Sequence, residues 1–205
     1  MRGFLTVLLV VSGLTVATSA GVAEDQVIRT VKGGILDEAK LYVDKLPALT
    51  TVVIRPLSAT DADLVNGEKK DETKKMQVDG PKMFTDEFVA KLKGRGPFTE
   101  VSALDVGSAA PAGALVIDGK FTEMDPGSRA KRYVVGFGAG KSGVTVEGSV
   151  KSAEGATFAT FQQRRVGVMG VAGGDSMGKL IADTKNIADD LAKFLSEWAK
   201  GNKLK

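Results

Sequence analysis

Residues 114–166 constrain the fold more than any other stretch, because they contain three predicted strands, and apolar and polar positions alternate in two of them. The first occurrence, at residues 114–124, predicts a strand with one apolar face and one mostly polar face. The second occurrence is at residues 143–151. The turn-forming residues 152–155 and a return strand at 156–166 follow it, which predicts a β-hairpin. Strands of this kind form a sheet that helices cover on one face only.

Two helices are expected to cover that face. The first spans Asp79–Lys93, with Asp79 as its cap, Pro81 in its first turn and Gly94 just beyond its end. Its apolar stripe comprises Phe84, Phe88 and Leu92.

The second helix follows a capping Asp175 or Ser176 and is stopped by Gly201. We expect Trp198, the only tryptophan, to anchor this helix in the core or at its edge. The apolar stripe comprises Leu180, Ile187, Leu191, Phe194, Leu195 and Trp198.

Further strands are expected at residues 50–57 and, near a sheet edge, at 98–104. The order of these elements predicts an α/β fold, a two-layer sandwich with a mixed, mostly antiparallel sheet and both helices packed on one face. We expect this single domain to occupy residues 49–200, with a frayed tail at 201–205. Residues 24–48 form a lead-in, in which Ile35, Ala39, Tyr42 and Leu46 fit one face of a helix.

Residues 1–23 are typical of a secretory signal peptide. Arg2 provides the positive start, residues 4–11 form an apolar run, and small residues allow cleavage after Ala20 or Ala23. The alternative is an uncleaved anchor, although the apolar run is near the lower limit for spanning a membrane. We therefore expect a periplasmic or secreted protein.

Two missing residue types exclude several classes of chemistry. The chain has no Cys and no His, so a thiolate nucleophile, a lipidated cysteine anchor, a histidine base and a Cys or His zinc site are all excluded. The formal net charge of +3 is too small to indicate a nucleic-acid partner. The oligomeric state cannot be read from the sequence.

A glycine-rich segment before the hairpin looks like a nucleotide loop but departs from the pattern. Gly140, Lys141 and Ser142 resemble the end of a phosphate-binding loop, yet Val135 occupies the position of its first glycine. A dinucleotide motif fails too, because Lys141 stands where its third glycine belongs. A calcium loop would need a run of oxygen ligands that is not present. We expect no nucleotide, cofactor or metal.

The basic turn before that segment is the candidate partner-binding site. Arg129, Lys131 and Arg132 are close together, are not interleaved with acids and adjoin flexible glycine backbone. They predict docking of an anionic partner, or else a solvated basic loop or salt bridges to a helix. The expected partner-binding residues are Arg129, Lys131, Arg132, Gly138, Gly140 and Lys141.

Three carboxylates, Asp118, Glu123 and Asp125, raise the possibility of acid/base chemistry. Strict alternation would place Asp118 and Glu123 on opposite faces of their strand. Asp125 begins a sequence of ordinary turn residues. These residues are therefore interpreted as structural.

Two passages resemble a bacterial envelope family known as domain of unknown function 4410. They are DPGSRAKRYVVGFGAGKSGVTVEGSV (Asp125–Val150) and GGDSMGKLIADTKNIADDLAKFL (Gly173–Leu195). The resemblance implies a fold related to the N-terminal domain of TolB, to activators of penicillin-binding proteins and to the curli secretion lipoprotein. Those relatives are non-enzymatic, and the family has no catalytic residues to carry over.

Two functions follow from these observations. The first is an exported, non-enzymatic interaction or assembly module, with an envelope protein or an anionic envelope polymer as its partner. The alternative is a small-ligand or glycan-binding protein, or a glycan hydrolase that uses Asp118 and a second carboxylate.

Overall fold

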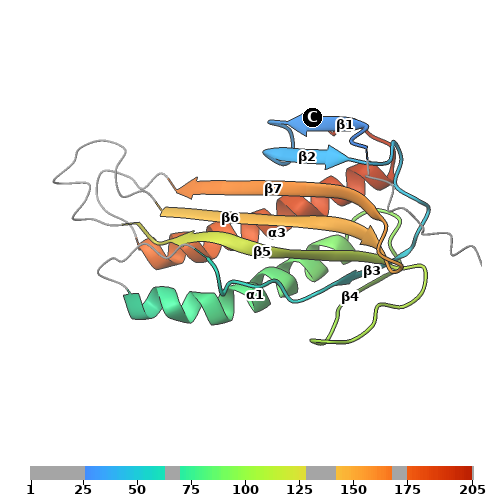
Figure 1. Cartoon of the computed structure of the whole chain (residues 1–205). Helices are drawn as coiled ribbons and strands as arrows, with labels where there is room; N and C mark the ends of the chain where they lie inside the picture. The colour runs from blue at the N-terminus through green and yellow to red at the C-terminus, as the bar shows by residue number, and fades with distance from the viewer. Residues whose placement is uncertain (1–25, 63–69, 128–141, 168–174, 205) are drawn as a thin grey trace, which may run out of the picture.

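The computed structural model describes residues 26–62, 70–127, 142–167 and 175–204. They form one seven-stranded sheet, and both helices pack against the same face of it (Figure 1). The strand order is β1-β2-β7-β6-β5-β3-β4. The elements are β1 (Arg29–Lys32), β2 (Glu38–Leu41), β3 (Thr51–Ile54), α1 (Lys70–Lys93), β4 (Glu100–Ala103), β5 (Leu115–Asp125), β6 (Ser142–Ser152), β7 (Thr157–Gly167) and α3 (Ser176–Ala199).

The predicted fold class is confirmed. β3 pairs in parallel with both β4 and β5, and every other pairing in the sheet is antiparallel. The expected strands at 50–57, 98–104 and 114–124 correspond to β3, β4 and β5, and β4 lies at the sheet edge as expected. The hairpin of β6 and β7 is also confirmed.

The core lies between the sheet and the two helices. Phe84, Phe88 and Leu92 of α1 are fully buried, and Phe84 meets Phe121 of β5 edge to face with ring centroids 5.8 Å apart. Burial of one such side chain contributes about 1.5–3 kcal/mol to folding. The expected stripe of α3 is buried as well, which confirms the assignment of its inner face.

Local contacts fix both ends of α3. The side chain of Asp175 accepts a hydrogen bond from the Met177 amide at 3.0 Å, as a helix cap does. The chain then leaves the helix at Gly201, whose φ of +73° suits glycine. Trp198 is a core anchor, 2% exposed, and its indole Nε1 donates to the Asp44 carbonyl at 3.4 Å.

The expected start of the first helix was wrong. α1 begins at Lys70, so Asp79 is not its cap and Pro81 lies inside it. The acidic residues Asp71 and Glu72 occupy the first turn, where they interact favourably with the helix dipole. This part of the helix is mostly polar and has no broad apolar stripe, so periodicity alone could not reveal it.

The helix expected in the lead-in was also wrong. Residues 29–41 form the β1–β2 hairpin, and β2 pairs with β7 from Glu38↔Gln162 to Leu41↔Ala159. Ala39 and Leu41 are buried while Lys40 is exposed, so the side chains follow the period of a strand. Pairing with a distant strand outweighed the local helical spacing.

The C-terminal end is docked up to its last described residue. Leu204 is 3% exposed and belongs to the main core, although we expected a frayed tail. Burial of this apolar side chain contributes about 1.5–3 kcal/mol toward ordering the tail.

Candidate interaction face

All six predicted partner-binding residues lie outside the described residues, within positions 128–141. The structure does place the two ends of that segment. β5 ends at Asp125 and β6 begins at Ser142, and their register pairs Asp125 with Gly143. Ser142 is also paired with Gly167, the last residue of β7, so residues 168–174 attach at the same end of the sheet.

The sheet face opposite the helices is called the open face here. No described helix covers it (Figure 1), and residues 104–114 lie over Val53 and Val116 at one side of it. Across β5, β6, β7 and β2, this face carries polar and charged side chains that interact across the strands.

A bulge in β5 changes which carboxylates share the open face. The register shifts between Phe121 and Glu123, so Phe121 and Met124 both point into the core. Glu123 is therefore on the same face as Asp118, and the expectation of opposite faces was wrong. A bulge inserts one residue and reverses the alternation beyond it.

Glu123 is held by two side chains from neighbouring strands. Arg164 of β7 donates from Nε to Oε2 at 2.7 Å and from Nη2 to Oε1 at 2.9 Å, and Thr145 of β6 donates to Oε2 at 2.7 Å. The hydrogen bond from Arg164 lowers the pKa of Glu123 more than partial burial raises it. The same bond raises the pKa of Arg164.

Glycine makes room for this pair. A Cβ at Gly143 would lie within 3 Å of the Glu123 carboxylate, because the carboxylate rests directly over the Gly143 backbone. Gly143, which lies just after the predicted basic segment, therefore leaves the space that the Glu123 carboxylate occupies in the ion pair.

Asp118 is the centre of a second cluster on the open face. It accepts from the Ser149 hydroxyl at 2.5 Å, and the Lys151 ammonium lies 3.2 Å from its other oxygen. Neither carboxylate oxygen is free of a protein contact, so this aspartate is built into the sheet as an ion pair.

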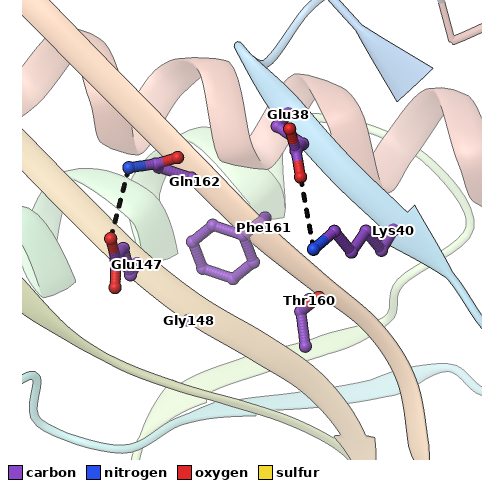
Figure 2. A pocket seen from close by; sticks show the side chains of 7 residues that line it. All are labelled: Glu38, Lys40, Glu147, Gly148, Thr160, Phe161 and Gln162. Atoms are coloured by element: carbon purple, nitrogen blue, oxygen red, sulfur yellow. Dashed lines mark hydrogen bonds and ion pairs between the residues drawn. The ribbon is translucent and has the colours of Figure 1, made fainter. Parts of the chain in front are cut away.

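A shallow depression lies farther along the open face, between β2 and β6. Its volume is about 320 Å³. Figure 2 shows Phe161 and Gly148 between two polar rims, with Glu38 and Lys40 on one side and Glu147 and Gln162 on the other. The lining residues are Glu38, Lys40, Glu147, Gly148, Thr160, Phe161 and Gln162.

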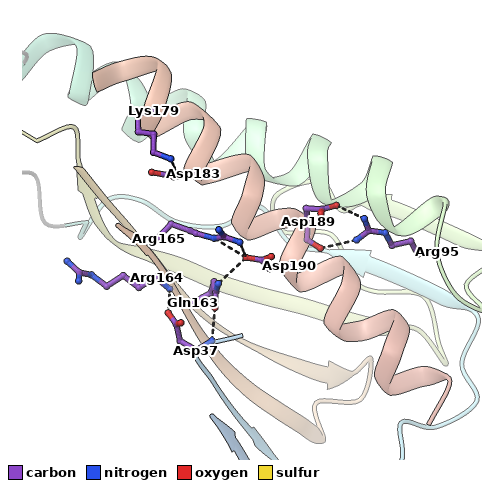
Figure 3. A network of polar contacts seen from close by, with 9 residues as sticks. All are labelled: Asp37, Arg95, Gln163, Arg164, Arg165, Lys179, Asp183, Asp189 and Asp190. Carbon is purple, nitrogen blue, oxygen red and sulfur yellow. Dashed lines mark hydrogen bonds and ion pairs between the residues drawn. The ribbon is translucent and has the colours of Figure 1, made fainter. Parts of the chain in front are cut away.

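A separate polar network joins the layers at the other face of β7 (Figure 3). Arg165 donates to Asp190 of α3 at 2.5 Å, and Gln163 donates to the same oxygen at 3.0 Å. Gln163 also accepts from the Asp37 amide at 2.7 Å, which ties the β1–β2 turn to α3. These groups satisfy one another and hold the layers together.

Sequence patterns missed most of the open-face residues. The available signal was the alternation in 143–151, which puts Thr145, Ser149 and Lys151 on one face of the predicted hairpin. Arg164 follows from the same reasoning on the return strand. Their partners could not be assigned without the strand register.

The described residues hold no group of three carboxylates that could bind a metal ion. No helix in those parts of the chain is both long enough and apolar enough to span a membrane.

Comparison with known proteins gives one family match. The model described as "Domain of unknown function (DUF4410)" matches residues 43–171. No curated protein matches the chain. Among solved structures, the PelC dodecamer from Paraburkholderia phytofirmans is 11% identical, with 80% of this chain and 95% of that chain covered and a TM-score of 0.42. A crystal structure titled as an uncharacterized protein is 10% identical, with coverages of 74% and 96% and a TM-score of 0.44.

Proposed function

This chain belongs to the family described as Domain of unknown function (DUF4410), and on that premise we propose that it is an exported, non-enzymatic interaction module of the cell envelope. Its partner is an envelope protein with an acidic surface or an anionic envelope polymer. Docking uses the end of the sheet where residues 128–141 join β5 to β6.

The observation that carries the proposal is how charge is distributed around that end. On the open face, Glu123 is paired with Arg164 and Asp118 with Lys151, so these charges largely cancel within the sheet. By contrast, the sequence between Asp125 and Glu147 contains four cations and no acid. Basic groups of this kind attract anionic partners over roughly one Debye length, about 8–10 Å.

The positions of Asp118 and Glu123 favour a binding role for the chain and argue against a glycan hydrolase that uses these two carboxylates. Their cross-strand partners, Ser149 and Thr145, are four residues apart on β6. At about 3.3 Å per residue this separates the two backbones by roughly 13 Å. Glycosidase carboxyl groups lie about 5–10 Å apart. Glu123 is also held ionised by Arg164, which does not suit a general acid.

The test is crosslinking of the exported chain to its neighbours in intact cells, followed by capture and identification. Arg129→Ala/Arg132→Ala should reduce partner capture, and the reduction should shrink in high salt, where the wild type also loses electrostatic attraction. The control is Lys74→Ala/Lys75→Ala, which removes the same charge from exposed positions on α1. Equal capture by wild type and the arginine variant would contradict the proposal.

The same variants distinguish docking from a structural role. We expect the free energy of unfolding of the arginine variant to lie within about 1 kcal/mol of that of the wild type, as is usual for surface substitutions. A large loss of stability would instead indicate that one arginine is a strut of the fold, and the docking proposal would then be wrong.

A second candidate function is binding of a neutral glycan in the open-face depression. The depression favours it, because amide, hydroxyl and carboxylate groups line it. Thr160→Trp should fill the depression and abolish binding of envelope oligosaccharides in calorimetry. If calorimetry detected no heat when these oligosaccharides were added to the wild type, this candidate function would be ruled out.

A further inference from the structure

A basic hollow lies at the β1 edge of the sheet and is lined by residues of β1 and of the C-terminal end of the chain. Figure 1 shows that end of the chain beside β1. The volume of the hollow is about 410 Å³. Val31 and Leu204 supply apolar surface within it and pack against the main core. The remaining lining residues are Arg29, Thr30, Lys32 and Lys203.

Two of the three cations at this hollow have no counter-charge in the part of the chain that the structure describes. Lys32 lies 2.9 Å from Glu38, whereas Arg29 and Lys203 form no ion pair with any residue that the structure describes. Arg29 and Lys203 line the hollow without an ion pair among the described residues, and cations placed in this way provide a site for an anion. Arg29 suits a phosphate in particular, because its guanidinium offers two parallel donors.

Two exposed apolar residues directly precede the strand that lines the hollow. Val27 is 41% exposed and Ile28 60% exposed, directly before β1. Large hydrophobic residues exposed next to each other beside cations are typical of surfaces that contact the lipid headgroup layer. A soluble anion would use the cations but would leave Val27 and Ile28 in water.

The edge strand itself does not favour a second copy of the chain. If two β1 strands paired antiparallel about their centre, Arg29 of each would oppose Lys32 of the other. Like charges directly across a strand pair are destabilising, and charged edge strands resist such pairing.

We propose that this hollow is a docking site for the phosphate headgroups of an anionic membrane, with Val27 and Ile28 entering the headgroup layer. The site is independent of the proposed partner site. It lies beyond the C-terminal end of α3, whereas residues 168–174 precede the N-terminal end, and this 24-residue helix is about 36 Å long.

The experiment is flotation of the exported chain with vesicles, with inorganic phosphate as a soluble competitor. The wild type should bind vesicles of phosphatidylethanolamine with phosphatidylglycerol and not vesicles of phosphatidylcholine alone. Arg29→Gln/Lys203→Gln should weaken binding roughly thirty-fold, because each cation near the membrane surface contributes about 1 kcal/mol to the binding free energy. Ile28→Ser should weaken it several-fold without any change in charge.

Matched controls decide between specific docking and general attraction. Lys74→Gln/Lys75→Gln makes the same charge change on α1, near the opposite edge of the sheet. Because these lysines are distant from the hollow, this variant should bind vesicles with an affinity within about two-fold of the wild type. An equal loss in both double variants would overturn the proposal. Binding to phosphatidylcholine vesicles, or full displacement by phosphate with no effect of Ile28→Ser, would overturn it too.

Discussion

The guanidinium of Arg164 on β7 reaches across β6 and donates two hydrogen bonds to the carboxylate of Glu123 on β5. Three adjacent strands are thereby joined on the open face, with Thr145 of β6 as the third member. The arrangement depends on the bulge in β5, since without it Glu123 would point into the core.

This pair should make stability depend on pH in a defined direction. The pKa of Glu123 is lower in the folded protein than its ordinary value of 4.5. The pair therefore stabilises the fold above that value, and the stabilisation is lost as the pH falls through the lower folded-state pKa. Arg164→Gln should cost about 1 kcal/mol at neutral pH, a modest figure because the arginine is half exposed.

Urea unfolding of both proteins over a pH series measures that effect. The difference in unfolding free energy should be largest at neutral pH and should close below the ordinary glutamate pKa. A difference that stayed constant across the acid range would mean that Arg164 acts through packing and not through Glu123.

The inner face of α3 should dominate the stability of the domain. Leu191 is fully buried, and truncation of such a residue typically costs ~2–5 kcal/mol. Leu191→Ala should therefore lower the melting temperature strongly, while Lys185→Ala on the exposed face should change it little. Similar melting temperatures for the two variants would show that the helix is not anchored as the structure indicates.

Close contact between β5 and β6 should make one glycine hard to replace. A Cβ at Gly119 would lie 2.4 Å from the Glu147 carbonyl oxygen, and this backbone atom cannot move without disturbing the strand pair. Gly119→Ala should cost about 1–3 kcal/mol. Gly94→Ala is the control, since its Cβ would meet only ordinary contacts; equal unfolding midpoints in urea would contradict the strand geometry.

Processing of the N-terminus gives another test. The three-part signal in residues 1–23 predicts a mature form that begins at Gly21 or Glu24. N-terminal sequencing of the exported protein checks this prediction. Recovery of the exported chain with Met1 still present would support the uncleaved anchor instead.

The sequence predicted well those elements whose patterns are long. β5, the β6–β7 hairpin and α3 each extend over 11 residues or more, and their apolar positions repeat often enough to define an inner face. β2 has only four residues. Ala39 and Leu41 alternate there, but Ile35, Ala39 and Tyr42 also match a helix, and only pairing with β7 decides between the two.

The candidate site was less predictable, for two physical reasons. Alternation assigns Glu123 to the wrong face because a single-residue bulge has no clear signature in its neighbours. The pairing of Asp118 with Lys151 depends on register between strands, which a pattern within one strand does not contain. The partner-binding role of Arg129 and Arg132 remains a prediction.

The β1–β2 hairpin has a practical consequence for work with fragments of this chain. Its strand β2 pairs with Ala159–Gln162 of β7 and covers that part of the 11-residue strand. The edge of the sheet is then formed there by the short, charged β1. The family match begins at residue 43, after the hairpin. A fragment cut at that boundary would leave β7 with unpaired backbone groups that can template association between molecules. Such a fragment should be prone to aggregation, and recombinant versions are better started before Ile28.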